Sequence, residues 1–298
     1  MNTPTLPFAQ KTSLFSVCLS LLVTAFIAVA VFALPSVQAA PVDDAMAAFL
    51  NQQKAKTETL EAKDDAGKQA KELSLQHLEE QTEKTKLVMD DTVETRKACV
   101  GCLQYTAEDT FVDMLIKGEI SKVEVIYITP QPLTPLCNQP GTAGDESFHP
   151  VNRGQVDITE TVTRRTDSVR RLLAYAKSNP GQMTLHFVHT QKGYTERTEQ
   201  QQGIFNAISE AGDCQNIIFN AIKEEIPPEM VGASYWVTAT DGQQFLWSLT
   251  GKQAIQEIDS SQQAWTIYFG RLDDPTIKAR SEGIKDFYGK AVPGQGSD

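Results

Sequence analysis

The chain has 298 residues, and its 38 acidic side chains outnumber its 27 basic ones, for a net charge of −11 at neutral pH. This balance argues against nucleic acid or an anionic membrane as the main partner, because both carry negative charge themselves. The length suits one sizeable α/β domain with an appendage.

The first forty residues have the features of a secretory signal. Lys11 precedes an uncharged apolar run over residues 14–34, Pro35 then interrupts the helix, and Ala39 lies where a signal peptidase would cut. A helix over the run is long enough to cross a bilayer, so an uncleaved anchor is the alternative to cleavage. We expect residues 1–40 to direct export, which makes the mature chain periplasmic or secreted and keeps it off the membrane unless the anchor is retained.

A long helical arm is predicted for residues 41–98. Residues 42–97 contain no proline and a single glycine, Gly67, and they are rich in Ala, Gln, Glu and Lys, which favour helices. A continuous helix would extend about 80 Å, so we expect the arm either to bend near Gly67 or to project. Its apolar stripe is thin, which leaves three alternatives: a solvated stalk, a self-associating coiled coil, or a surface that docks onto another protein.

Residues 99–298 are predicted to form a disulfide-stabilised α/β body of the mixed α+β kind. Runs of β-branched and aromatic residues indicate strands, and Asp241-Gly242 is a strong hairpin signal. The predicted strands are residues 122–129, 183–190, 234–240, 244–249 and 265–270. The predicted helices are residues 106–117, 167–178, 198–225 and 275–288. This order favours a mixed sheet of about five strands with helices packed on it, in which the first two strands can pair in parallel.

The cysteines are interpreted through the exported compartment. Loss of Cys18 with the signal leaves Cys99, Cys102, Cys137 and Cys214, an even number that indicates two disulfides. We favour the pairs Cys99–Cys102 and Cys137–Cys214. The alternative is a redox-active Cys99–Cys102 pair beside a helix N-terminus, although no predicted strand leads directly into it.

Metal, haem and catalytic motifs are not found. No second cysteine or histidine pair completes a zinc site, and Leu103 stands where a c-type haem motif requires histidine. His186 and His189 lie three apart on a predicted strand, so they should face opposite sides of the sheet. His149 lies near two carboxylates in a long loop, but neighbours in sequence do not make a catalytic triad. No metal or cofactor is therefore predicted.

Two clusters are candidates for binding. Arg164, Arg165, Arg170 and Arg171 form the one dense basic patch and are candidates for an anion or partner site; the alternative is an exposed helix face that neutralises nearby acids. The three tryptophans lie on predicted strands, where aromatic side chains usually build the core, with a stacking surface for a glycan or peptide as the alternative.

The leading hypothesis is a non-catalytic, exported protein of the cell envelope, a component of or accessory to an envelope or secretion assembly. The helical arm would contact a protein partner or a second copy of the chain. The alternative function is a periplasmic thiol-disulfide protein that uses Cys99 and Cys102. A third class is a secreted enzyme with a site around the long loop at residues 131–154, whose length suits a functional loop.

Overall fold

The computed structural model describes residues 42–62, 64–90, 103–129, 159–191, 214–254 and 263–293. All of them belong to one compact unit that extends from Ala40 to Asp298. The helices are α2 (Val42–Glu58), α3 (Asp65–Gln81), α5 (Gln104–Lys117), α8 (Thr159–Ser178) and α11 (Pro275–Tyr288). The strands are β1 (Lys86–Asp90), β2 (Ile120–Ile128), β3 (Met183–Thr190), β4 (Ile217–Ile222), β5 (Gly232–Ala239), β6 (Gln244–Ala254), β7 (Gln263–Arg271) and β8 (Val292–Pro293).

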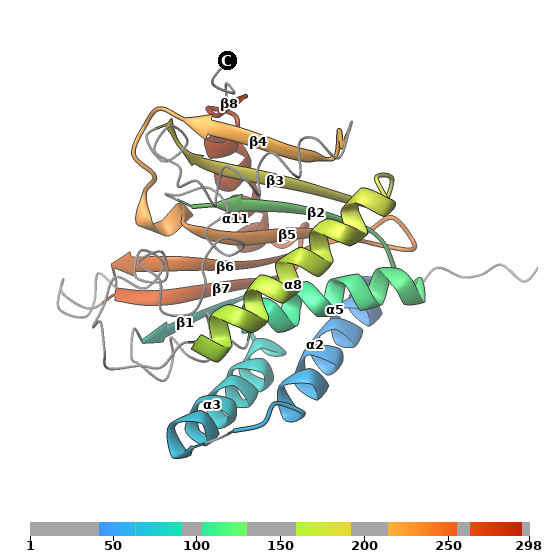
Figure 1. The fold of residues 1–298 in the computed structure, drawn as a ribbon, viewed down its shortest axis with the longest axis vertical. Helices are drawn as coiled ribbons and strands as arrows, with labels where there is room; N and C mark the ends of the chain where they lie inside the picture. Colours follow the sequence, from blue (N-terminus) through green and yellow to red (C-terminus); the bar gives the residue numbers. More distant parts are fainter. Residues whose placement is uncertain are drawn as a thin grey trace, which may run out of the picture. The chain divides into compact units, whose positions relative to one another are not determined.

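The described strands form one mixed sheet in the order β1-β7-β6-β5-β2-β3-β4-β8. The strands β2, β3 and β4 run parallel to one another, and every other pairing is antiparallel. Helices cover both faces: α2, α5 and α8 lie in front of the sheet in Figure 1, and α11 lies behind it. The result is a three-layer α/β arrangement.

The larger core lies between the sheet and the front helices. Phe49 of α2 has no exposed surface and stacks on Phe111 of α5, with 4.6 Å between ring centroids. The ring of Phe49 also packs against Trp247 and Phe269 of the sheet, at centroid distances of 6.2 and 5.5 Å. Helix α2 is therefore an integral part of this core.

The smaller core lies beneath α11. Asp274 caps this helix by accepting hydrogen bonds from the backbone N–H groups of Thr276 and Ile277, at 2.8 and 3.1 Å. One face of the helix buries apolar side chains against the sheet. The indole N–H of Trp236 donates to Ser281 Oγ at 2.8 Å, which satisfies a buried donor at the interface.

Several predicted elements are confirmed. The structure has strands at β2, β3 and β7, a hairpin of β5 and β6 around Gly242, and α11 over the predicted residues. Gly242 has a φ of 88°, which suits glycine in the tight turn. The parallel pairing of the first two predicted strands is also found, between β2 and β3. Helix α8 begins at Thr159, several residues before the predicted start.

The predicted strand number is wrong, because the sheet has eight strands rather than about five. Residues 217–222 were expected within a helix but form β4, which is paired on both sides. A short apolar run that is buried on both faces lacks the alternation of an exposed strand, and periodicity cannot separate it from a helix. The other two missed strands, β1 and β8, are only five and two residues long.

The described residues of the predicted arm, which end at residue 90, form two helices and a strand. The chain turns between the end of α2 at Glu58 and the start of α3 at Asp65, just before Gly67. Asp64 caps α3 by accepting a hydrogen bond from the N–H of Gly67 at 2.6 Å. The following strand, β1, then joins the sheet beside β7. Several apolar side chains of the arm are thus buried, which a projecting helix would leave in water.

Candidate functional site

An open groove of about 570 Å³ lies where three parts of the chain meet. One wall is the first three turns of α2, the second is the turn between α3 and β1, and the third is the end of β7 with the start of α11. The lining residues are Asp43, Met46, Ala47, Leu50, Asn51, Gln81, Thr82, Glu83, Lys84, Thr85, Phe269, Gly270, Arg271, Asp273 and Asp274.

Three apolar side chains that pack on the core, Met46, Leu50 and Phe269, form what we call the floor of the groove. Met46 and Leu50 lie one helical turn apart on α2, and both pack against the main core, as does Phe269 on β7. These side chains are fixed by the core beneath them, so the floor is preformed. An apolar side chain that entered the groove would find a ready surface for burial.

The rim carries charges that are mostly held in place by one another. Arg271 donates to Asp273 through Nε and Nη2, at 3.1 and 3.0 Å, and its Nη1 lies 3.2 Å from Asp43 Oδ2. The hydrogen bonds that Arg271 donates to the Asp273 carboxylate raise the pKa of Arg271. Lys84 Nζ pairs with Glu80 at 3.1 Å. Both rim cations are therefore already bound to carboxylates.

The rim has an excess of negative charge. It holds four acidic side chains against two basic ones, a balance of −2. Glu83 is exposed and makes no ion pair with any described residue. Gln81 is buried beside the groove: its Nε2 donates to the carbonyl of Lys84 at 2.8 Å, while its Oε1, which has almost no accessible surface, has no hydrogen-bond partner. The groove thus suits a ligand that combines an apolar group with hydrogen-bond donors or a positive charge.

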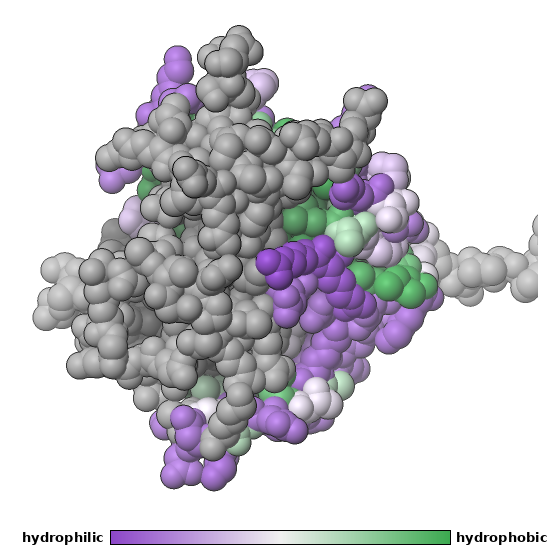
Figure 2. All heavy atoms as spheres, viewed as in Figure 1, coloured by the Kyte–Doolittle hydropathy of each residue, from purple (hydrophilic) through white to green (hydrophobic). Residues whose placement is uncertain are grey.

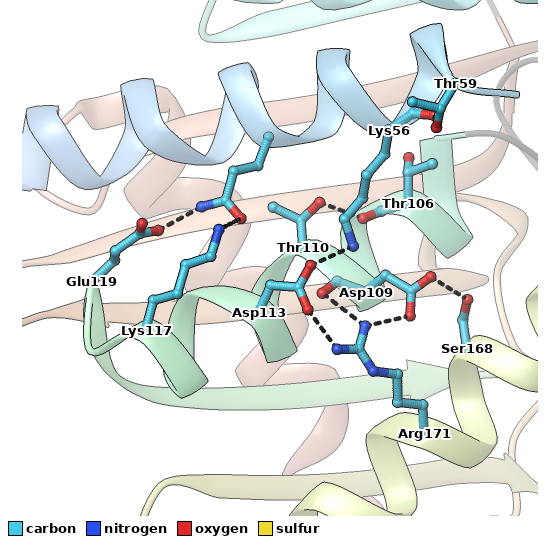
Figure 3. Close-up of polar contacts among 11 residues, drawn as sticks. Lys56, Thr59, Thr106, Asp109, Thr110, Asp113, Lys117, Glu119, Ser168 and Arg171 are labelled. Carbon is cyan, nitrogen blue, oxygen red and sulfur yellow. Dashed lines mark hydrogen bonds and ion pairs between the residues drawn. The ribbon is translucent and has the colours of Figure 1, made fainter.

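The arginine patch that the sequence singles out lies on α8. Arg171 reaches across to α5, where Nη1 lies 3.0 Å from Asp109 Oδ1 and Nη2 lies 2.5 Å from Asp113 Oδ1 (Figure 3). Arg170 pairs with Asp167 on its own helix at 3.4 Å. The side chains of Arg164 and Arg165 lie outside the described residues, so the anion-site prediction for them stays a prediction. Both described arginines of the patch carry their own counterions.

Asp113 is the centre of a polar network that joins three helices. It accepts from Lys56 of α2 at 2.8 Å as well as from Arg171 of α8, and Ser168 donates to the neighbouring Asp109 at 3.2 Å (Figure 3). Burial by itself raises the pKa of Asp113, but the hydrogen bonds from Lys56 and Arg171 outweigh it and lower the pKa overall. Figure 2 shows that the described side chains over α2 and α5 on this face are mostly hydrophilic. The ion pairs of Asp113 and Asp109 therefore link α2, α5 and α8 to one another.

The two histidines of β3 lie on opposite faces of the sheet, as predicted. His186 faces α11, where its Nδ1 lies 2.8 Å from the Tyr288 hydroxyl and its Nε2 lies 3.3 Å from Glu124 Oε1. The hydrogen bond from His186 lowers the pKa of Glu124. His189 is buried on the other side, so the two rings cannot share a metal or a substrate.

The predicted disulfide residues are described only in part. Cys214 precedes β4, is half-buried and packs against the main core. Cys99, Cys102 and Cys137 lie outside the described residues, so both predicted pairings remain predictions. Helix α5 begins at Gln104, two positions after Cys102.

The tryptophans build the core rather than a binding surface. Trp236, Trp247 and Trp265 are 2%, 1% and 9% exposed, which leaves no open ring face for a glycan or peptide. The groove, in contrast, was missed at the sequence level because its walls come from segments far apart in the chain. The Asp43-Asp44 and Asp273-Asp274 pairs at two helix starts were the available signal.

In the described part of the chain, no group of three or more His, Cys, Asp or Glu side chains is arranged to hold a metal ion. None of the described helices combines the length and the apolar character that a membrane span needs. No protein-family model matches the chain, and no curated protein matches it in a sequence comparison.

Proposed function

We propose that this chain is an exported, non-catalytic binding protein that serves an assembly of the cell envelope, and that the groove beside α2 takes a segment of its protein partner. The observation that carries the proposal is an apolar floor beneath a rim with more carboxylates than cations. A partner segment with an apolar side chain next to a Lys or Arg suits both parts. Export is inferred from residues 1–40.

Each part of the groove has a defined role in this proposal. Burial of a Leu-sized side chain on Met46, Leu50 and Phe269 would contribute about 1.5–3 kcal/mol. A cation of the partner would pair with Glu83, whose carboxylate is not engaged by a described residue.

Selection of binders from a random peptide library displayed on phage tests the proposal. We expect the selected peptides to share a basic residue beside an apolar one, and we expect Asn51→Trp, which fills the groove from α2, to abolish their binding. Glu83→Lys should weaken binding at least about tenfold by replacing attraction with repulsion. Glu72→Lys, an equal charge change at an exposed site on α3 away from the groove, is the matched control. Peptides that bind equally well to Asn51→Trp would contradict the proposal.

Self-association is tested with the same variants. If the groove binds a second copy of the chain, sedimentation should show a concentration-dependent oligomer that is lost in Asn51→Trp and Glu83→Lys and kept in Glu72→Lys. Deletion of residues 42–97 is unsuitable for this purpose, because it removes Phe49 and its neighbours from the core.

The thiol-disulfide function is kept as the second candidate because of one observation. Helix α5 starts two residues after Cys102 in the chain, and the positive end of a helix dipole stabilises nearby thiolates. Measurement of the reduction potential of the Cys99–Cys102 pair decides between the two functions. A potential below about −300 mV indicates a structural bridge, whereas about −120 to −200 mV with an acidic thiol indicates a redox protein.

A further inference from the structure

Arg280 differs from the other arginines whose side chains are described. Arg170, Arg171 and Arg271 each form an ion pair with at least one carboxylate. Arg280 is the most deeply buried of the four, and it forms no ion pair with any described residue. A buried cation without a counterion is unfavourable, so its surroundings call for an explanation.

The hydrogen bonds of Arg280 are few. Its Nη2 donates to the backbone carbonyl of Glu229 at 3.0 Å, and its Nη1 has only the sulfur of Met230 as acceptor, at 3.8 Å. The buried Nε has no partner. Because a guanidinium has five N–H donors and sulfur is a weak acceptor, most of the donor capacity is unused. Burial accordingly lowers the pKa of Arg280, although electrostatic interactions with Tyr268 and Glu229 oppose this.

A second cation lies near the Tyr268 ring. The Arg280 guanidinium carbon is 5.2 Å from the centroid of the Tyr268 ring, and Lys86 Nζ is 5.5 Å from the same centroid. Lys86 and Tyr268 are direct cross-strand neighbours in the β1–β7 pair. Lys86 is exposed, and it too forms no ion pair with a described residue. Two positive charges thus lie near one aromatic ring without an ion pair to a described residue, and an anion beside the ring would be attracted by both.

We propose that Arg280 and Lys86 form a binding site for an oxyanion, either a carboxylate or a phosphate group, beside the ring of Tyr268. The planar fork of Arg280 matches two oxygens of such a group, and Lys86 supplies a mobile point charge. The oxyanion takes the place of the Met230 sulfur at Nη1, and the flexible methionine side chain can move aside.

This site is independent of the groove beside α2. The two sites have opposite electrostatic character: the groove rim has an excess of carboxylates, whereas Arg280 and Lys86 are cations without an ion pair to a described residue. They also share no residue. Loss of peptide binding at the groove would therefore not remove oxyanion binding at Arg280, and the reverse holds as well.

Titration of the purified chain with succinate, and separately with inorganic phosphate, tests the proposal. Ionic strength is kept constant with chloride, and the backbone N–H resonances of Tyr268 and Met230 are followed by NMR. We expect saturable shifts that chloride does not produce. Arg280→Gln should bind at least about tenfold more weakly, because a hydrogen bond to a charged group contributes that much or more. Lys86→Gln should bind severalfold more weakly, and Arg170→Gln, which removes an exposed and paired arginine, should bind as the wild type does.

Two further comparisons keep the test decisive. If Arg280→Gln does not fold, Arg280→Lys and the exposed Lys86→Gln replace it, and both should weaken binding, since Arg280→Lys keeps the charge but loses the fork. Stronger binding of succinate identifies the ligand group as a carboxylate, and stronger binding of phosphate identifies it as a phosphoryl group. The proposal is overturned if neither anion shifts the wild-type resonances more than chloride, or if the Arg280 and Lys86 variants bind as tightly as the wild type.

Discussion

Replacement of Phe49 by alanine tests whether α2 is part of the core. Phe49 has no exposed surface, and its ring packs against those of Phe111, Trp247 and Phe269. Phe→Ala substitutions in protein cores cost about 3–5 kcal/mol, and the packing against these three rings places Phe49→Ala toward the upper end. Because domains of this kind unfold with about 5–15 kcal/mol, Phe49→Ala should remove a large fraction of the total stability.

Urea unfolding followed by tryptophan fluorescence measures this cost, since Trp236 and Trp247 are buried and report on the sheet. Asn51→Ala is the matched control: it lies on the same helix, is exposed, and should change the free energy of unfolding by no more than about 0.5 kcal/mol. A loss below about 1 kcal/mol for Phe49→Ala would refute the reasoning, because that result is expected of a solvated arm that stands away from the body.

Three further predictions concern single sites. Gly232→Ala should destabilise the fold by at least about 2 kcal/mol, because φ is 150° and a Cβ would lie 2.1 Å from a backbone carbonyl oxygen of β6; Gly118→Ala, with φ of 70° and open space, should cost less in the same urea assay. Ser281→Ala leaves the indole N–H of Trp236 unpaired, and thermal unfolding should reveal a loss of about 1–3 kcal/mol, with no loss if water replaces the hydroxyl. Burial lowers the pKa of His77 below its usual value of about 6.5, so the unfolded chain binds a proton more readily than the folded chain does. The contribution of neutral His77 to the free energy of unfolding is therefore complete above about pH 6.5 and is lost as the pH falls through the folded-state pKa. His77→Gln should flatten that part of the stability–pH curve.

The candidate sites differ in how far the sequence could predict them. The alternative interpretation of the arginine patch, as a helix face that neutralises local acids, describes Arg170 and Arg171 well, because their partners include acids one turn away or on the neighbouring helix α5. The groove and the Arg280 site gave no motif. Arg280 and Lys86 are separated by almost two hundred residues, and both come near the Tyr268 ring only because β1 pairs with β7 and α11 packs on the sheet.

Local sequence determined those elements whose signals are complete within a few residues. The Asp241-Gly242 turn specifies the β5–β6 hairpin, Asp274-Pro275 begins α11, and Gly118 ends α5 with a φ of 70°. In each case the backbone preference of one or two residues and the periodicity of their neighbours suffice.

Tertiary structure alone decided where the remaining segments are placed. The apolar positions of residues 42–90 are too sparse to reveal their partner, yet Phe49 completes the aromatic core and β1 adds an edge to the sheet. The apolar run of β4 likewise does not specify a strand by itself, and it becomes one because β3 supplies hydrogen bonds along one side. The physical reason is that burial and strand pairing depend on contacts between residues far apart in the chain, which no local pattern records.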